Sequence, residues 1–209
     1  MKTKPSFDEE EILWNTGYDF AIGIDEVGRG AFAGPIFAAA VVFPRFFKSP
    51  FLKFINDSKL LKPKERETLA VEIKKSALFY SIASIGVGVI NRKGIGAANK
   101  MVFRKVIAQS ILKLKGKHFV LADGFHIKYV KGVGLKNQKA IIGGDRKSIS
   151  IAAASIIAKV ERDKLMRDLN RVYPNYGLKR NKGYGTLEHR TAIKLNGLSR
   201  IHRIAFCHP

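Results

Sequence analysis

Short apolar segments rich in β-branched residues alternate along this chain with longer segments of helical spacing. Strand composition occurs in residues 18–24, 36–43, 79–90, 118–121 and 140–142. Helical patterns occur in residues 101–114, 148–170 and 187–195. Two more helices are expected: one starts at Ser6, which has the capping-box spacing to Glu9, and one starts at Pro63. Strands that alternate with helices predict an α/β fold, in which a mixed central β-sheet is flanked by helices.

The charge balance is strongly basic. Lys and Arg total 38 against 17 Asp and Glu, which gives a formal net charge of +21. Such a surface repels itself and favours a polyanionic partner, with nucleic acid as the first candidate. An anionic membrane surface is an alternative partner, and a source organism with generally basic proteins would also account for the charge. Charge alone does not separate binding from catalysis.

The N-terminus and the cysteine content indicate a cytoplasmic protein with no membrane partner. An acidic run, residues 8–11, stands where a secretory signal needs apolar residues. The longest strongly apolar stretch, residues 149–160, is interrupted by Ser150, Ser155 and Lys159 and is too short to span a bilayer. The one cysteine, Cys207, permits no internal disulfide, which is compatible with a reducing cytosol.

Three of the expected strands end at acidic residues: Asp25 with Glu26, then Asp123, then Asp145. In open α/β sheets, sites form outside the carboxyl ends of the strands. Clustered carboxylates repel one another and raise each other's pKa, and a divalent cation relieves this repulsion. Ligands that are all oxygen favour Mg²⁺ or Mn²⁺, and two such ions can stabilise the attacking and leaving oxygens of a phosphodiester hydrolysis.

Each acid can also have an ordinary structural role as a helix cap, a turn residue or a surface salt-bridge partner. For Asp145, which lies just before Ser148 and an expected helix, capping is a strong competitor. Asp25 and Glu26 differ from the others, because two charges directly after a buried strand are costly without a partner. Spacing alone therefore makes the four-acid cluster a hypothesis.

Several motifs in this chain resemble those of ribonuclease HII. The first covers residues 23–30, Gly-Ile-Asp-Glu-Val-Gly-Arg-Gly, and continues to Val41. The second motif of the family is similar to residues 57–59, the third to residues 122–124 and the fourth to residues 144–163. The C-terminal part of the family is similar to residues 183–186 together with His189, His202, Arg203 and Phe206. The likeness covers about residues 18–206. It departs from the family pattern at Ala31, where Pro is usual, and at Gly143, where Lys is usual.

The resemblance implies a ribonuclease H-like fold, divided into an N-terminal helical extension (residues 1–17), a catalytic domain (18–170) and a C-terminal helical portion packed on it (171–209). It also implies a catalytic, metal-binding site of Asp25, Glu26, Asp123 and Asp145 with two Mg²⁺ or Mn²⁺ ions. Members of the family cut the RNA strand of RNA–DNA hybrids. They also cut on the 5′ side of single ribonucleotides in duplex DNA, leaving a 3′-hydroxyl and a 5′-phosphate.

Substrate-binding roles are implied for Gly28, Arg29, Gly30, Lys59, Ser148 and Tyr184. Reading a 2′-hydroxyl needs close approach of the backbone, which Gly28 and Gly30 permit because they lack Cβ. Arg29 would face phosphate, and Lys59 a phosphate or the carboxylates. Tyr184 resembles the tyrosine that packs on the deoxyribose beside the ribonucleotide. An ordinary tight turn at residues 28–30 and a core or surface aromatic at Tyr184 are the alternatives.

Two other functions remain open on sequence alone. One is a non-catalytic, basic nucleic-acid-binding protein whose acids are only caps. The other is a different ribonuclease H-like nuclease such as the HIII type, which normally carries an extra N-terminal substrate-binding domain, whereas only 17 residues precede the first expected strand here. The expected partners are RNA–DNA hybrid and ribonucleotide-containing duplex DNA, bound by a monomer. We assign His189 and His202 structural roles.

Overall fold

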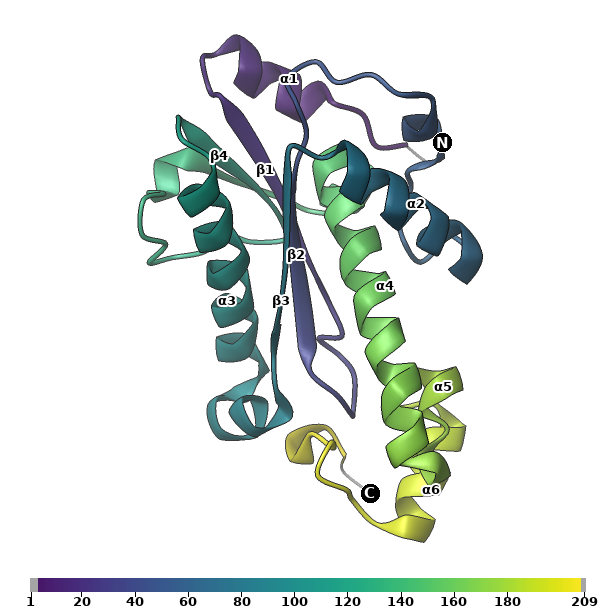
Figure 1. Cartoon of the computed structure of the whole chain (residues 1–209). Helices are drawn as coiled ribbons and strands as arrows, with labels where there is room; N and C mark the ends of the chain where they lie inside the picture. Colours follow the sequence, from purple (N-terminus) through teal and green to yellow (C-terminus); the bar gives the residue numbers. More distant parts are fainter. Residues whose placement is uncertain (1–3, 208–209) are drawn as a thin grey trace.

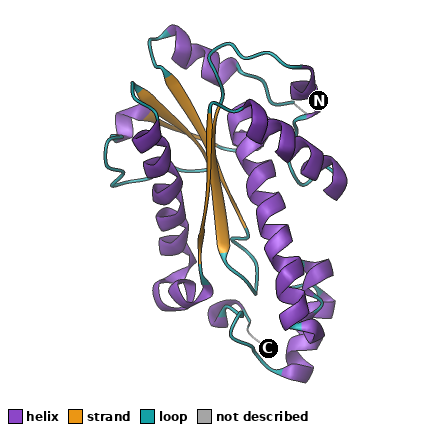
Figure 2. Cartoon of the chain, in the orientation of Figure 1, coloured by secondary structure: helices purple, strands orange, loops and turns teal. Residues whose placement is uncertain are grey.

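A five-stranded mixed sheet runs through the part of the chain that the computed structural model describes, residues 4–207 (Figures 1 and 2). Its strands, in the order β3–β2–β1–β4–β5, are β1 (Phe20–Val27), β2 (Ile36–Val42), β3 (Phe79–Ile85), β4 (His118–Asp123) and β5 (Gln138–Ile141). Strands β1, β2 and β3 are antiparallel neighbours, whereas β4 lies parallel to β1 and to β5. The predicted α/β fold with a mixed sheet is confirmed.

Helices cover both faces of this sheet (Figure 1). The α-helices are α1 (Asp8–Asn15), α2 (Pro63–Ser76), α3 (Val87–Lys113), α4 (Ile149–Val172), α5 (Leu178–Asn181) and α6 (Leu187–Asn196). Short 3-10 turns are η1 (Pro50–Phe54), η2 (Leu135–Asn137), η3 (Gly144–Arg146), η4 (Pro174–Tyr176) and η5 (Ile204–Phe206). None of the described helices is both long and apolar enough to cross a bilayer.

Two hydrophobic cores form because alternate strand residues point to opposite faces of the sheet. Ile22 and Ile24 of β1 pack with Phe103 and other residues of α3 on one face. On the other face, Val27 and the alanines and isoleucines in the first half of α4 pack with α2. The strongly apolar start of α4 is therefore explained: it lies flat on the sheet and is buried.

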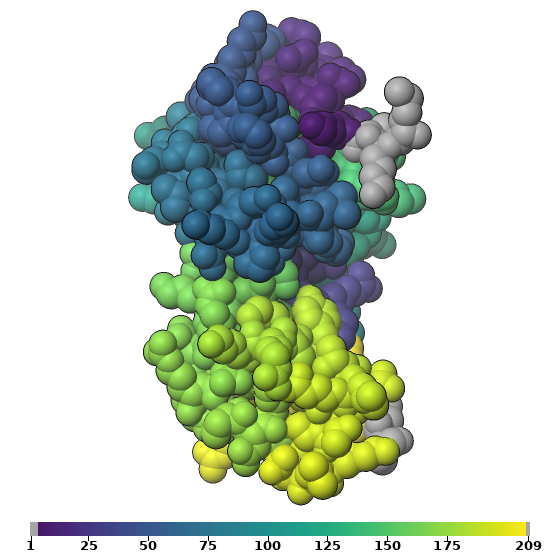
Figure 3. Space-filling view, turned by 90° about the vertical axis from the view of Figure 1, so that its right-hand side faces the viewer, coloured from purple at the N-terminus to yellow at the C-terminus, as the bar shows by residue number. Residues whose placement is uncertain are grey.

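The second half of α4 runs past the sheet and carries the C-terminal helices. Met166 packs there with Tyr176, Leu178 and Ala192 in a separate small core. Figure 3 shows these yellow and green segments gathered at the opposite end of the molecule from the purple and blue N-terminal third. The ends of the expected extension and C-terminal portion, residues 1–3 and 208–209, lie outside the described residues.

Several element boundaries differ from the sequence predictions, and two of them have a clear physical reason. The apolar run of residues 79–90 was expected to be one strand, but β3 ends at Ile85 and α3 begins at Val87 after Gly86. Val87 and Ile90 are apolar because they are buried by a helical turn, and α3 breaks at Gly94, where φ is 77°. The capping box expected at Ser6 does not form, because α1 begins at Asp8 after Phe7 without a side-chain cap.

Candidate active site

Asp25 and Asp123 occupy adjacent positions on two parallel strands. Ile24 pairs with Ala122, so the next residue of each strand is an aspartate at the same level of the sheet. Since Ile24 and Ala122 belong to the core under α3, strand alternation turns both aspartates toward α4. The two acids lie 98 positions apart in the sequence, and the sheet brings them together as predicted. They are still part of the strands, whereas the sequence analysis placed Asp25 and Glu26 after β1.

Asp25 is held in a fixed orientation. Its Oδ1 accepts a hydrogen bond from the Glu26 backbone N–H at 2.7 Å, and Ser155 of α4, which lines the same cavity, lowers the pKa of this carboxyl. Glu26 projects to the other side of β1, where Arg29 Nη1 lies 3.9 Å from its Oε1. The neighbouring acids of β1 thus point to opposite faces of the sheet.

Asp145 lies in the 3-10 turn η3, directly after β5. The turn is attached to β4, because Gly144 N–H donates to Asp123 Oδ1 at 2.7 Å. Lys59 Nζ lies 3.7 Å from Asp145 Oδ2, so the expected contact of Lys59 with the carboxylates is present. Asp145 is 5% exposed, and the helix α4 is capped by Ser148 and not by Asp145.

The acids act on one another electrostatically. Burial raises the pKa of Asp25 well above its ordinary value, and repulsion from Glu26, Asp123 and Asp145 raises it further. Burial also raises the pKa of Glu26 and of Asp145, against the opposing charges of Arg29 and Lys59 respectively. Burial and the neighbouring carboxylates thus disfavour the charged form of Asp25, and burial does the same for Glu26 and Asp145.

This donor set fits a divalent cation. All four groups are carboxylates, which are the ligands that Mg²⁺ and Mn²⁺ prefer. Within residues 4–207, no three acidic, histidine or cysteine side chains converge into a ready-made metal cage. Carboxylates without a cation between them repel one another, and a divalent cation held by these residues would offset that repulsion.

A cavity of about 430 Å³ opens beside the acids. It brings together nearly all of the predicted site residues and several that the sequence analysis did not assign. It is lined by Asp25, Glu26, Val27, Gly28, Arg29, Gly30, Ser58, Lys59, Asp123, Ser155, Lys159 and Tyr184. Of the predicted residues, Asp145 and Ser148 do not line it.

The two glycines of the Gly28-Arg29-Gly30 turn have different reasons to lack a side chain. Gly28 has φ of 90°, and a Cβ placed on it would lie 2.2 Å from Arg162 Nε. A side chain at this position is therefore excluded by packing against Arg162, whereas the backbone of Gly28 lines the cavity, and its substrate-binding role stays a prediction. A Cβ on Gly30 would meet nothing within 4 Å, so the space expected for close approach is open at Gly30.

Two buried arginines hold this turn in place. Arg162 donates hydrogen bonds to the carbonyl oxygens of Ala33, Pro35 and Lys182. Arg203 donates to the carbonyl oxygens of Gly34, Gly28 and Arg29, the last two at 2.7 and 2.9 Å. The backbone of the turn is thereby fixed from α4 and from the C-terminal segment.

Tyr184 is brought to the cavity by backbone pairing with the same loop. Phe32 N–H and Ala33 N–H both donate to Gly183 O, and Ala31 forms a β-bridge with Tyr184. The charges of Lys159 and Arg162 lie 5.6 and 5.3 Å from the centre of the Tyr184 ring. The aromatic ring is thus at the cavity wall and flanked by two cations.

His189 and His202 support Tyr184 from behind. His189 Nδ1 is 3.0 Å from Tyr184 O, and the two Nε2 atoms are 3.2 Å apart. Both rings are buried, and burial lowers the pKa of each. Their bonds are to the backbone, to Ser199 and to each other, which is the structural role expected for them.

The structure corrects the substrate-binding role expected for Ser148. The residue is completely buried, its hydroxyl donates to Glu10 Oε1 at 2.7 Å, and it accepts from Ile151 N–H at 3.2 Å. No surface of its side chain is open to a substrate. Ser148 is the N-cap of α4, which explains the presence of a small hydroxyl residue at this point.

Ser58, Ser155 and Lys159 line the cavity but were not assigned a role from the sequence. Ser58 Oγ and Ser155 Oγ are hydrogen-bonded at 2.9 Å, and Lys159 Nζ lies 2.8 Å from Asp163 Oδ1. One signal was available. Ser155 and Lys159 are four residues apart, so they form a polar stripe on one face of an otherwise apolar helix.

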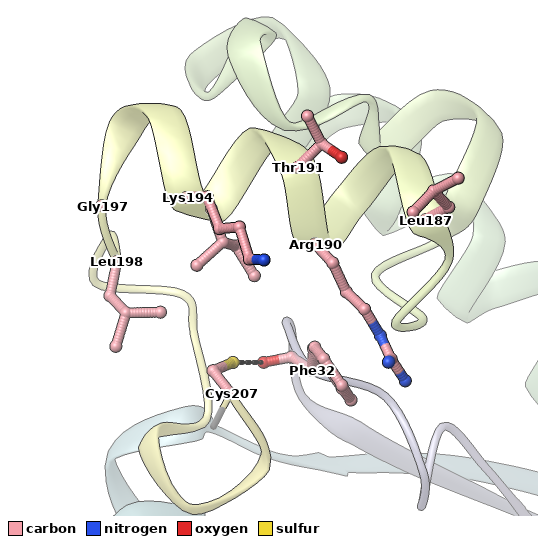
Figure 4. Close-up of a pocket in the computed structure, with 9 residues that line it drawn as sticks. Phe32, Leu187, Arg190, Thr191, Lys194, Gly197, Leu198 and Cys207 are labelled. Atoms are coloured by element: carbon pink, nitrogen blue, oxygen red, sulfur yellow. Dashed lines mark hydrogen bonds between the residues drawn. The ribbon is translucent and has the colours of Figure 1, made fainter. Parts of the chain in front are cut away.

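A second cavity, of about 540 Å³, lies between α6 and the loop that carries Phe32 (Figure 4). Arg190 and Lys194 extend into it from α6, and the guanidinium of Arg190 lies 5.5 Å from the Phe32 ring centre. The Cys207 thiol donates to Phe32 O at 3.6 Å. None of the predicted site residues lines this cavity, which is therefore separate from the acidic site.

Comparisons with known proteins agree with the geometry. The family model described as ribonuclease HII matches residues 22–208. A ribonuclease HII from Acholeplasma laidlawii is 47% identical over 199 residues, which cover 94% of this chain and 92% of the relative.

Solved structures show the same fold. A ribonuclease HII of Archaeoglobus fulgidus, solved in complex with PCNA, aligns with a TM-score of 0.74 at 24% identity, covering 91% of this chain and 96% of that one. Bst-RNase HIII in complex with Mn²⁺ aligns with a TM-score of 0.66 at 20% identity, covering 91% and 68%. From the family match and the identity to its member, the chain belongs to the ribonuclease HII family, metal-dependent endoribonucleases that act on RNA–DNA hybrids.

Proposed function

We propose that this enzyme, besides cutting the RNA strand of hybrids, cuts on the 5′ side of a single ribonucleotide embedded in duplex DNA and leaves a 3′-hydroxyl and a 5′-phosphate. The observation that carries the proposal is one cavity that combines three of the four acids with the open Gly30 backbone, Arg29 and Tyr184. A metal site, a place for close backbone approach and an aromatic wall are the parts that such a reaction needs.

Asp25, Glu26, Asp123 and Asp145 would hold Mg²⁺ or Mn²⁺, and we propose two ions. Two bound ions would stabilise the charge on the attacking and leaving oxygens. The protein prepares the site with backbone hydrogen bonds: the Glu26 N–H fixes the Asp25 carboxylate, and the Gly144 N–H fixes that of Asp123. Fixed ligands lower the cost of reorganisation during the reaction.

Substrate recognition would divide between affinity and selectivity. Arg29 and Lys59 have side chains that are 57% and 79% exposed at the cavity, where they can bind phosphates of the duplex. Gly30 would permit the 2′-hydroxyl to contact the backbone, which distinguishes RNA from DNA. Tyr184 would pack on the deoxyribose that follows the ribonucleotide. We propose that a monomer carries out this reaction in the cytoplasm.

The decisive experiment uses a labelled DNA duplex with one ribonucleotide in one strand, incubated with Mg²⁺, Mn²⁺ or EDTA. We expect a single cut 5′ of the ribonucleotide with either metal and none with EDTA. An all-DNA duplex should stay intact. Binding without cleavage in every metal would support a non-catalytic binder, and cleavage of the all-DNA duplex at a similar rate would indicate a different nuclease.

A pair of variants tests the site. Asp25→Asn should bind the duplex as tightly as the wild type but cleave more slowly by more than about 100-fold, since loss of a ligand should exceed the 10–100-fold cost of losing a group that orients a ligand. Asp168→Asn is the matched control, because Asp168 is an exposed residue near the end of α4 whose salt-bridge partner is Arg171. Near-normal turnover of Asp25→Asn would remove Asp25 from the site.

A further inference from the structure

Helix α1 supplies a carboxylate to the start of α4, about 140 residues later in the chain. Glu10 is 1% exposed. Its Oε1 accepts hydrogen bonds from Ser148 Oγ at 2.7 Å, from Ser150 N–H at 2.9 Å and from Ser150 Oγ at 2.5 Å. Burial raises the pKa of Glu10, and these hydrogen bonds oppose that rise. Glu10 therefore caps a helix to which it does not belong.

The backbone just before α1 completes this cap. Ser6 N–H donates to Lys147 O at 3.2 Å, and Ile149 N–H donates to Ser6 O at 3.0 Å. The first N–H groups of a helix have no partner within that helix. Each of the first three N–H groups of α4 therefore has an acceptor. The N–H of Ile149 donates to the Ser6 carbonyl oxygen, that of Ser150 to the Glu10 carboxylate and that of Ile151 to the Ser148 hydroxyl. The helix dipole also favours a carboxylate at this end.

The capped end of α4 is continuous with the turn that carries Asp145. Ser148 N–H donates to Gly144 O at 2.9 Å, and Gly144 N–H donates to Asp123 Oδ1 at 2.7 Å. The turn is therefore held at one end by Asp123 and at the other by Ser148, whose hydroxyl donates to Glu10. Asp145 lies between these attachments on a short 3-10 turn, whereas Asp25 and Asp123 are held by the sheet. Repulsion among the acids would displace Asp145 most easily if the second attachment were lost.

The capped start of α4 lies directly on β1. A Cβ on Gly23 would be 2.2 Å from the carbonyl carbon of Ser150, so the start of α4 rests directly on the strand backbone. Gly23 precedes Asp25 by two positions on the same face of β1. Ser155, farther along α4, lines the cavity with Asp25 and lowers the pKa of that carboxyl. A shift of the α4 start would therefore change the placement of Asp145 and of Ser155 together.

We propose that Glu10 is a positioning residue of the metal site, which fixes Asp145 and the start of α4 relative to Asp25 and Asp123 without touching metal or substrate. The proposal rests on the proposed function of the four acids. It extends the site to the N-terminal helix, which lies outside the catalytic domain expected from the sequence.

The test compares Glu10→Ala with Glu11→Ala, which removes the same charge one residue later from an exposed position of α1. Mn²⁺ binding to the folded protein is measured by calorimetry well below the melting temperature. Kinetics on the single-ribonucleotide duplex are measured as a function of Mn²⁺. For Glu10→Ala we expect Mn²⁺ to bind about tenfold more weakly, the lower end of the range for groups that orient metal ligands. The kcat should fall while KM for the duplex is unchanged, and Glu11→Ala should match the wild type.

Two results would overturn the proposal. One is a folded Glu10→Ala protein that melts at a lower temperature but binds Mn²⁺ as the wild type does, because Glu10 would then contribute to stability alone. The other is equal weakening of Mn²⁺ binding by Glu11→Ala. If Glu10→Ala does not fold, Ser150→Ala, which removes one of the three hydrogen bonds, serves in the same comparison. Failure of the wild type to bind Mn²⁺ or to cleave would instead refute the proposed function.

Discussion

Arg162 occupies the space that a side chain at Gly28 would need. An ideal Cβ on Gly28 would lie 2.2 Å from Arg162 Nε, and the same guanidinium donates to the carbonyl oxygens of Ala33, Pro35 and Lys182. The glycine turn at the cavity and the segment leading to Tyr184 are thus locked by one side chain of α4.

Gly28→Ala should be strongly destabilising. The new Cβ would displace Arg162, and φ of 90° is unfavourable for any residue with a Cβ. Overpacking and backbone strain each cost about 1–3 kcal/mol, so we expect the free energy of unfolding to fall by roughly 2–4 kcal/mol. Urea denaturation followed by circular dichroism measures this change. Unaltered stability would mean that Arg162 does not fill this space.

Gly30→Ala is the matched variant and should separate packing from recognition. Because its Cβ would meet nothing within 4 Å, the free energy of unfolding should change by less than about 1 kcal/mol. Cleavage of the single-ribonucleotide duplex should nevertheless fall, because the methyl group would stand where the 2′-hydroxyl approaches. Steady-state kinetics with the purified variant provide the measurement. Full activity would show that substrate does not approach the backbone at this residue.

Without metal, the contribution of Asp25 to the stability of the protein should decrease as pH rises above the ordinary aspartate value of 3.8. The pKa of Asp25 is raised on folding, so the folded state binds this proton more tightly than the unfolded state. The associated stability is present at low pH and is lost as pH rises toward and through the raised pKa. Asp25→Asn lacks this loss, so it should melt at a higher temperature than the wild type at neutral pH in EDTA. A lower melting temperature would contradict the assigned shift.

Tyr184→Ala should discriminate between substrates. We expect its kcat/KM to fall roughly tenfold, or about 1.4 kcal/mol, on a single ribonucleotide in DNA, the size of one lost aromatic contact. On a long hybrid the loss should be smaller, because RNA-to-DNA junctions are rare there. Tyr184→Phe, which keeps the ring, should retain activity on both. An equal loss on both substrates would assign Tyr184 a structural role.

Sequence patterns were sufficient for the site residues that the sheet itself places. Asp25 and Asp123 were selected as candidates because each follows a segment of strand composition. Parallel pairing of β1 with β4 then places the two residues side by side. The pattern was less informative at residues 79–90, since an apolar run of that length fits an edge strand and the first turn of a buried helix equally well.

Roles that depend on contacts between distant segments were not predictable in the same way. Nothing local to Gly28 indicates that Arg162 lies against it, and nothing near Ser148 indicates that its hydroxyl bonds Glu10. A glycine next to a binding site and a serine before a helix can each serve several purposes. Only the packing of α1 and α4 on the sheet decides among them.

The parallel pairing of β1 with β4, and the seating of α4 on β1, have a consequence for synthesis on the ribosome. A nascent chain presents Asp25 and Glu26 early, but β1 gains its parallel neighbour only after residue 123 has emerged. Ser155, which lines the cavity with Asp25, follows about 30 residues later still. Incomplete translation products therefore carry most of the acids in no useful arrangement, and nuclease activity should begin only when nearly the whole polypeptide is free to fold.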